Sequence, residues 1–213
     1  MVDKKQSGKP SKRIRIKRAQ ARRDILESAR RLLDEEGLDA VTLASVSGEL
    51  GMSKQALYHY FSSKDALVRS LVTALLDEEV EALIAAVESR GKRRSVLGTL
   101  ITEFYSHYIH RLDAFRLVYC QSQLYTGLNL GKDPALIREE VNPRTRHLFD
   151  VLEECLVESG ASRTERKRAR QLAFTAWTSA LGLLTMLSVA DATNDPLVHT
   201  DQELLKTLVG LYE

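Results

Sequence analysis

A short run of polar side chains, residues 54–59, is suited to contact the base edges of duplex DNA. The side chains that would face outward from a helix in this run are Lys54, Gln55, Ala56, Tyr58 and His59. They supply donors, acceptors and a methyl group for the edges exposed in the major groove. Gln55 is the candidate base reader, because an amide can pair with adenine through two hydrogen bonds, worth about 1–3 kcal/mol of discrimination. The alternative is a solvated surface glutamine.

Hydroxyl and basic groups near this run are suited to phosphates. The hydroxyls of Thr42, Ser53 and Tyr58 match phosphate oxygens, as do the amides at capped helix starts. The first 23 residues hold ten Lys or Arg against one acid, although the whole chain has a formal net charge of only +2. This asymmetry indicates an anionic partner, either nucleic acid or an anionic membrane surface.

A second constellation could bind a metal ion. Glu103, His107 and His110 are spaced i, i+4 and i+7, which places a carboxylate and two imidazoles on one helical face. An exposed polar stripe gives the same spacing, and no fourth ligand can be assigned from the sequence. We therefore assign no metal site.

Signatures of enzyme active sites are missing from the sequence. It has no HExxH, GxSxG, Walker A or GxGxxG pattern, and the spacing of Gly127, Gly131 and Lys132 is wrong for a phosphate loop. Cys120 and Cys155 lack CxxC spacing, which indicates two free thiols in a reducing cytoplasm. We expect no catalytic residue and no cofactor.

The elements that position these residues are predicted to be helices. The four prolines leave a gap between Pro10 and Pro134, which permits long uninterrupted helices. Gly37 is expected to end the first helix, and Thr42, Ser53 and Ser63 are expected to cap the next three, over residues 43–50, 54–60 and 64–89. Further helices are expected over 96–112, 113–124 and 134–157. Two capping boxes, Ser162 with Glu165 and Thr200 with Glu203, should open two more. The predicted fold is all-α, with about nine helices.

One predicted helix is free of charge for 19 positions. Residues 172–190 approach the length that spans a bilayer. Five of them are Ser or Thr, Gly182 interrupts them, and no other candidate span exists. We therefore interpret them as a helix buried between its own domain and a partner subunit, not in a membrane. The last helix offers a matching stripe for a four-helix bundle across a two-fold axis: Leu204, Leu205, Leu208, Leu211 and Tyr212.

Residues 42–61 have the geometry of a helix-turn-helix. Two short helices are joined at Gly51, and the inward positions are apolar. The surrounding segment, residues 25–67, resembles the N-terminal domain of the TetR family of bacterial transcriptional regulators. The residues in register are Arg22, Ile25, Ala29, Gly37, Thr42, Val46, Gly51, Ser53, Leu57, Tyr58, Phe61, Lys64 and Leu67. Ser47 and Tyr60 depart from the commonest pattern.

The resemblance implies three parts. Residues 1–11 would be a flexible basic arm, 12–90 a DNA-binding domain with the start of a long connecting helix, and 91–213 a ligand-binding and dimerisation domain. Residues 54–59 would fall on the recognition helix, and Arg22, Thr42 and Lys64 where phosphates are bound. A dimer would read a pseudo-palindromic operator through successive major grooves. Arg13, Arg15 and Arg18 could enter the adjoining minor groove.

The resemblance also implies a cytoplasmic repressor that a small molecule releases from DNA. The aromatic residues of the second half suggest a mainly apolar pocket, and the candidate contacts are Phe104, Tyr108, Tyr119, Gln123, His147 and Trp177. Ordinary core packing is the alternative for each aromatic residue, and a surface position is the alternative for His147. A dimeric DNA-binding regulator without a small-molecule pocket, controlled by a partner or a metal, remains the alternative function.

Overall fold

The structure, a computed structural model, describes residues 12–91, 94–121, 135 and 137–213. Within these ranges all of the regular secondary structure is helical, which confirms the all-α prediction. The chain divides into two compact units, Met1–Val68 and Arg69–Glu213. The predicted arm, residues 1–11, lies outside the described ranges. The division falls inside helix α4 (Lys64–Ser89), whereas the sequence places a domain boundary just after this helix.

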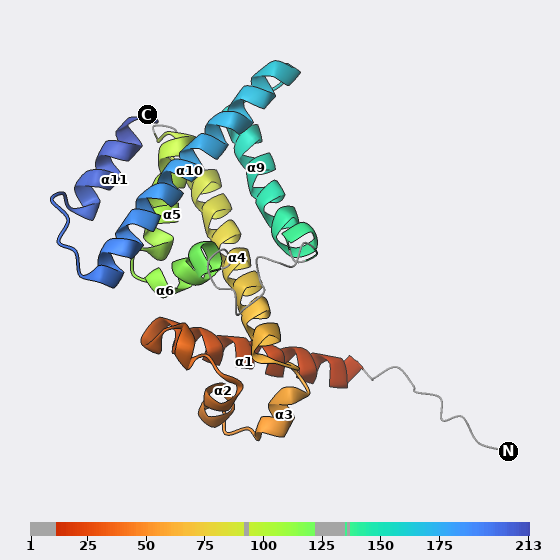
Figure 1. The fold of residues 1–213 in the computed structure, drawn as a ribbon. Coiled ribbons are helices and arrows are strands. Elements are labelled where there is room, and N and C mark those ends of the chain that lie inside the picture. Colours follow the sequence, from red (N-terminus) through yellow and green to blue (C-terminus); the bar gives the residue numbers. More distant parts are fainter. Residues whose placement is uncertain (1–11, 92–93, 122–134, 136) are drawn as a thin grey trace. The chain divides into compact units, whose positions relative to one another are not determined.

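The first unit contains α1 (Lys12–Glu36), the short 3₁₀ helix η1 (Leu38–Ala40), α2 (Leu43–Glu49) and α3 (Lys54–Tyr58), with the start of α4 (Figure 1). The apolar residues of α1 recur at helical spacing, and Ile25, Ala29 and Leu33 are fully buried. Val46 of α2 and Leu57 of α3 complete this core. α1 ends before Gly37, which adopts a positive φ of 81°.

Helix α3 is shorter than the sequence predicts. It ends at Tyr58 and not at Tyr60, because the next two amides turn back to nearer carbonyls: His59 N donates to Ala56 O (3.2 Å) and Tyr60 N to Leu57 O (2.9 Å). The chain then carries Phe61 into the core, where it is 1% exposed. The end of α3 is thus followed directly by a residue anchored in the core.

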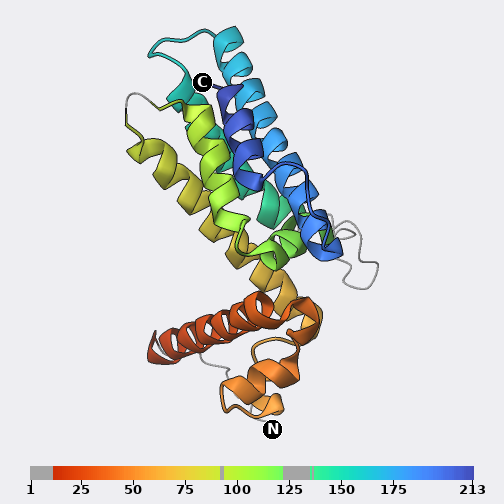
Figure 2. The same cartoon turned by 90° about the vertical axis from the view of Figure 1, so that its left-hand side faces the viewer.

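The second unit continues α4 and adds α5 (Val96–Tyr108), α6 (Leu112–Phe115), the π-helical η2 (Arg116–Gln121) and η4 (Ile137–Val141), α9 (Asn142–Leu156), α10 (Arg163–Thr193) and α11 (Asp201–Gly210). α10 packs against α5, α9 and α11, and α11 also packs against α5. Figure 2 shows these long helices side by side. Ser162 and Thr200 each form the predicted capping box, at the starts of α10 and α11.

The predicted helix over residues 96–112 ends earlier in the structure. α5 ends at Tyr108, whose carbonyl accepts a hydrogen bond from Arg111 N (2.8 Å) in a tight turn. Arg111 has a non-helical backbone, with φ −141° and ψ 48°, and α6 begins directly after it. The predicted end of this helix at residue 112 was therefore wrong, whereas the helix predicted from residue 113 is present as α6 and η2 as far as the structure describes it. The predicted helix from Pro134 appears as η4 followed by α9, with Pro134 itself outside the described residues.

Candidate DNA-binding surface and effector pocket

Two side-chain caps define the helix-turn-helix of the first unit. Thr42 Oγ1 accepts a hydrogen bond from Ser45 N (3.0 Å) at the start of α2, and Ser53 Oγ accepts one from Ala56 N (3.1 Å) at the start of α3. Between the helices Gly51 adopts a φ of 61°, a left-handed conformation that costs glycine least. The predicted caps at Thr42 and Ser53 are confirmed, and they hold both helices by their first turns.

Helix α3 presents a polar face to solvent. Leu57 is fully buried, whereas Lys54, Gln55 and His59 are exposed and Tyr58 is 53% exposed. Ala56 is half-buried. The structure thus leaves the predicted DNA-contacting set available at the surface, since only Leu57 anchors the helix inward.

The basic turns of α1 reach the end of α3. Arg18 Nη2 donates to His59 O (3.3 Å), and Arg22 Nη1 donates to Tyr60 O (3.2 Å). The Arg22 guanidinium also lies 4.2 Å from the centre of the Phe61 ring. These contacts fix the Arg22 side chain beside the recognition segment while leaving it exposed. The Arg18 contact could not be predicted from local spacing, because it joins residues 41 positions apart.

Arg13, Arg15 and Arg18 lie on α1, in its first two turns, and not in an extended arm. All three are exposed. A helix is too wide for the minor groove of B-DNA, which is about 6 Å across, so these residues would reach a phosphate backbone more readily. The structure therefore places these arginines on a helix and not on an extended arm, and their entry into a minor groove stays a prediction.

A polar cluster orients α2 on α1. Arg31 donates to Glu49 Oε1 through Nη2 (2.7 Å) and Nε (2.9 Å), and Ser28 Oγ donates to Glu49 Oε2. The hydrogen bond from Ser28, with those from Arg31, lowers the pKa of Glu49 below its ordinary value. Ser28 is fully buried, so this bond also satisfies a hydroxyl in the core. Sequence reasoning missed this cluster.

Two other predicted phosphate contacts lie at helix starts. Lys64 is the half-buried first residue of α4, which Ser63 caps by accepting from Ala66 N (3.1 Å). Thr42 is half-buried, and its hydroxyl lies 2.9 Å from Ser45 Oγ in addition to its capping bond. Both residues are placed where a helix start presents amides, which is the environment that phosphates prefer.

The core of the second unit is an aromatic cluster. Phe104 and Tyr108 are fully buried, and their rings pack edge to face with centres 5.5 Å apart. Tyr119 contacts both rings, at 5.7 and 5.9 Å. Trp177 lies next to this group, 6.2 Å from Phe104 and 6.0 Å from Tyr119. The packing of Phe104 and Tyr108 is that of core residues.

A buried carboxylate lies within this cluster. Glu79, from α4, is 2% exposed and accepts hydrogen bonds from Tyr108 Oη at Oε2 (2.6 Å) and from Tyr119 Oη at both oxygens (2.7 Å). Burial raises the pKa of Glu79 to about 7, and the two tyrosine hydrogen bonds lower it only in part. Sequence reasoning missed Glu79, which sits in an ordinary-looking run of acids.

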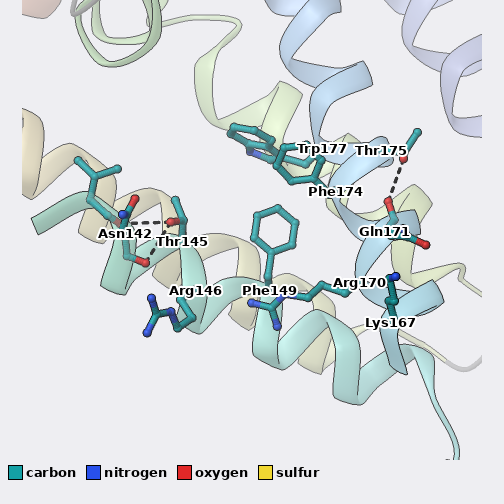
Figure 3. A pocket seen from close by; sticks show the side chains of 11 residues that line it. Asn142, Thr145, Arg146, Phe149, Lys167, Arg170, Gln171, Phe174, Thr175 and Trp177 are labelled. Carbon is teal, nitrogen blue, oxygen red and sulfur yellow. Dashed lines mark hydrogen bonds between the residues drawn. The ribbon is translucent and has the colours of Figure 1, made fainter. Parts of the chain in front are cut away.

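A pocket of about 900 Å³ lies between α9 and α10. Its apolar part is formed by Phe149, Phe174 and Trp177, whose rings turn toward one another in Figure 3. Polar side chains complete the lining: Asn142, Thr145, Arg146, Lys167, Arg170, Gln171 and Thr175. A volume of this size is in the range of small-molecule sites.

The predicted ligand contacts are distributed over different environments. Trp177 lines the pocket between α9 and α10. Phe104, Tyr108 and Tyr119 belong to the aromatic core beside it, and His147 is an exposed residue of α9 that does not line it. Gln123 lies outside the described residues. Phe149 and Phe174 form the apolar part of the lining together with Trp177. From the sequence they could be grouped only with the other aromatic residues of the second half.

The metal hypothesis for Glu103, His107 and His110 does not hold. Among the described residues no group of three His, Cys, Asp or Glu side chains is placed to share a metal ion. The physical reason is that α5 ends at Tyr108, so His110 lies beyond the helix and off its face.

The outer face of α10 is unusually apolar for a surface. Phe174, Met186 and Val189 are exposed, and a groove of about 570 Å³ passes along Thr178, Gly182, Thr185 and Val189. The hydroxyls on this helix donate to carbonyls of the preceding turn, as Thr185 Oγ1 does to Leu181 O (2.8 Å), which masks their polarity. By length and composition α10 could cross a membrane, and its other face packs against α5, α9 and α11.

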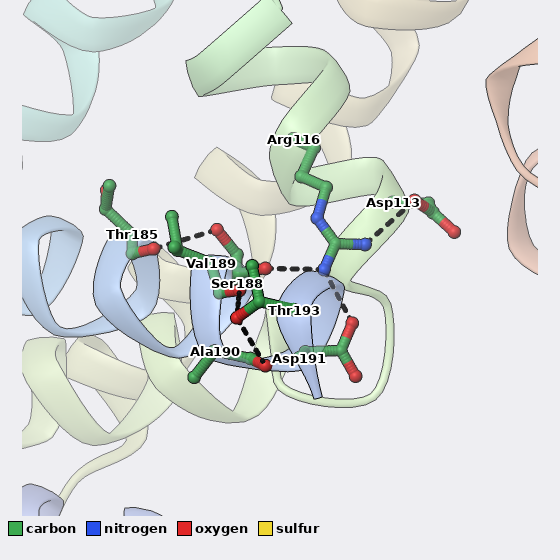
Figure 4. Close-up of polar contacts among 8 residues, drawn as sticks. All are labelled: Asp113, Arg116, Thr185, Ser188, Val189, Ala190, Asp191 and Thr193. Atoms are coloured by element: carbon green, nitrogen blue, oxygen red, sulfur yellow. Dashed lines mark hydrogen bonds and ion pairs between the residues drawn. The ribbon is translucent and has the colours of Figure 1, made fainter. Parts of the chain in front are cut away.

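Arg116 ties the carboxyl end of α10 to the rest of the unit. Its guanidinium donates to Asp113 Oδ1 (3.0 Å), Ser188 O (2.6 Å) and Asp191 Oδ2 (2.5 Å), as Figure 4 shows. The side chain is 19% exposed, so solvent screens these contacts less than those of a surface pair. The contacts fix the position of the α10 outer face relative to α6.

Comparison with known proteins agrees with this arrangement. Residues 25–71 match the family model described as bacterial regulatory proteins, tetR family. The HTH-type transcriptional repressor Rv1474c of Mycobacterium tuberculosis is 43% identical over 73 residues, which are 34% of this chain and only 37% of that protein. The HTH-type transcriptional repressor KstR2 of Rhodococcus jostii is 26% identical over 68% of this chain and 69% of its own length.

Solved structures share the fold across both units. The regulatory protein SCO4313 has a TM-score of 0.69 at 17% identity, covering 96% of this chain and 98% of its own. A transcriptional regulator from Saccharomonospora viridis, solved in complex with choline, has a TM-score of 0.63 at 19% identity and covers 91% and 95%. The relatives are transcriptional regulators and not enzymes. Residues 25–71 therefore form an N-terminal domain of the tetR type, and the chain as a whole shares its fold with solved structures of transcriptional regulators, one of them described as of the TetR/AcrR family.

Proposed function

We propose that this protein is a cytoplasmic transcriptional repressor that binds a pseudo-palindromic operator as a homodimer and is released by a small molecule. The observation that carries the proposal is the exposed polar face of α3, held by the Ser53 cap and by buried Leu57. A short capped helix with donors and acceptors on its free side is the form that enters a major groove.

Phosphate contacts would come from residues around α3. Arg22 and Lys64 flank the recognition segment, and Arg18 extends the basic surface along α1. Contacts of this kind fix the register of a protein on DNA and carry most of the salt dependence. Gln55 remains the residue assigned to read a base.

A homodimer would cover the outer face of α10. This face exposes Met186 and Val189 around a groove that includes Gly182. Exposed apolar surface of this kind marks an interaction site, and a two-fold axis brings the same patch of both protomers together. Leu211, which directly follows α11 and is 76% exposed, would also contribute.

The effector would bind between α9 and α10, in the 900 Å³ pocket beside Trp177. Support for a ligand in this fold comes from the Saccharomonospora viridis regulator, which was solved with choline bound. The alternative, a dimeric regulator without an effector pocket, is favoured by one observation: Phe104 and Tyr108 are packed as core residues.

Selection of binding sites from a random duplex library tests the DNA-binding half directly. We expect enrichment of one pseudo-palindromic sequence, and anisotropy titrations that saturate at two protomers per duplex. Gln55→Ala should lose preference at one position of each half-site, whereas Gln20→Ala, an exposed glutamine of α1, should not. Enrichment of no sequence would overturn the proposal.

A further inference from the structure

The pocket between α9 and α10 carries an excess of positive charge. Among the described residues, three cationic side chains line it, Arg146, Lys167 and Arg170, and no carboxylate does. Arg170 is neutralised by Asp150 (2.6 Å) and Glu153 (3.4 Å). Arg146 and Lys167 form no ion pair with any residue that the structure describes. Two positive charges at the pocket therefore lack a counter-charge.

The middle of the pocket is aromatic. Ring centres are 5.7 Å apart for Phe149 and Phe174, 5.8 Å for Phe174 and Trp177, and 6.1 Å for Phe149 and Trp177. Phe174 is 53% exposed, so covering it would remove apolar surface from water. In Figure 3 Arg146 and Lys167 lie on either side of these rings, on α9 and α10.

We infer that this pocket binds an amphipathic organic anion, an apolar molecule that carries a carboxylate or a comparable acidic group. The inference deepens the proposed function and rests on it for the regulatory meaning of the site. The apolar body would cover the three rings, and the acid would pair with Arg146 or Lys167 at the edge. A cationic ligand would meet two uncompensated positive charges and gain no partner.

Glu79 does not change this charge balance. It is absent from the pocket lining, and both of its oxygens already accept hydrogen bonds from Tyr108 and Tyr119 within the core. A cation would have to break those bonds and enter the packed cluster to reach the carboxylate. The free charges that an entering ligand meets are therefore positive.

Trp177 makes the inference directly measurable. It is the only tryptophan of the chain and lines the pocket, so its emission reports on the site. The full-length protein is titrated with decanoate, decanol and decyltrimethylammonium, each below its micellar concentration, with calorimetry as a second readout. We expect decanoate to bind about tenfold more tightly than decanol, because charge-assisted pairing adds to burial, and decyltrimethylammonium to bind most weakly.

Paired variants separate charge from shape. Arg146→Gln with Lys167→Gln should lower the affinity for decanoate about tenfold, to that of decanol, and leave decanol unchanged. The matched control, Arg163→Gln with Lys206→Gln, removes two exposed cations outside the pocket and should change neither. Equal affinity for decanoate and decanol in the unmodified protein would overturn the inference, as would tighter binding of the ammonium compound.

Failure of the inference and failure of the proposed function give different results. If the ammonium compound or the alcohol binds best and releases DNA, the proposed function stands and the ligand class is wrong. If none of the three changes Trp177 emission or gives heat, both the inference and the effector site between α9 and α10 are overturned. DNA binding by α3 is measured separately and is untouched by either outcome.

Discussion

The face of α3 and the core around Glu79 both gather polar side chains, but they use them in opposite ways. On α3, Lys54 and Gln55 point to solvent and no described residue pairs with them. In the core, Glu79 is buried and its oxygens are fully engaged by Tyr108 and Tyr119. Polar side chains that only water satisfies stay available to a partner, whereas a buried polar group that is satisfied within the protein helps to specify the fold.

The largest expected effect separates core aromatic residues from pocket aromatic residues. Phe104→Ala should lower the free energy of unfolding by about 3–5 kcal/mol, because it opens a cavity in a fully buried site. Phe174→Ala is the matched control, since Phe174 is 53% exposed and should cost far less. Urea unfolding monitored by circular dichroism measures both. Equal losses of unfolding free energy in the two variants would contradict the difference in burial between the two rings.

The next largest effect is a dependence of the free energy of unfolding on pH, which Glu79 causes. Because its pKa is raised to about 7 in the folded protein, the native state holds the proton more tightly than the unfolded chain does. The stabilisation that the bound proton gives to the folded protein is fully present below about pH 4.5. It is lost as pH rises toward 7, by about 3 kcal/mol in total. Glu79→Gln should therefore gain stability relative to the unmodified protein as pH rises from 5 to 8.

Comparison with Asp65→Asn controls for the loss of a carboxylate. Asp65 lies in the first turn of α4 and is only half-buried, so the variant should show no comparable gain between these pH values. A stability difference between Glu79→Gln and the unmodified protein that stays constant from pH 5 to 8 would contradict the raised pKa.

A smaller effect is expected on α3. Gln55→Ala should weaken binding to the selected operator by about 1–3 kcal/mol and leave binding to unrelated DNA unchanged, because the amide is assigned to a base and not to a phosphate. Anisotropy titrations with both duplexes measure the difference. Equal weakening on both duplexes would reassign Gln55 to the backbone.

The smallest effect concerns Lys64. Lys64→Ala should weaken binding on every sequence and reduce the slope of log affinity against log salt by about one unit, since one phosphate contact is removed. Lys206→Ala, on α11, serves as the control for the loss of one positive charge. A slope that stays unchanged in Lys64→Ala would remove this residue from the DNA contacts.

The sequence predicted local features better than long-range ones. The caps at Thr42, Ser53 and Ser162 were predictable because each depends on residues three positions apart. The Glu79 cluster was not, because it joins α4 to residues 29 and 40 positions later. The metal hypothesis failed because helical spacing assumes a continuous helix, whereas α5 ends at Tyr108 and Arg111 has a non-helical backbone.

The existence of an apolar pocket in the second unit could be predicted from the sequence, but its position could not. Aromatic composition indicated an apolar site in the second unit, and Trp177 does line one. Its main partners, Phe149 and Phe174, face each other only because α9 and α10 pack together, which no spacing rule within one helix reveals. The charged edge formed by Arg146 and Lys167 arises in the same way.

The central claim is that two copies of α3, held by a symmetric dimer, read two half-sites of one operator. It is tested most directly by anisotropy titration of the selected duplex against duplexes with one or both half-sites scrambled. The account predicts two protomers on the intact duplex and a loss of specific affinity when either half-site is scrambled. Binding by a single protomer, or binding indifferent to scrambling, would contradict it.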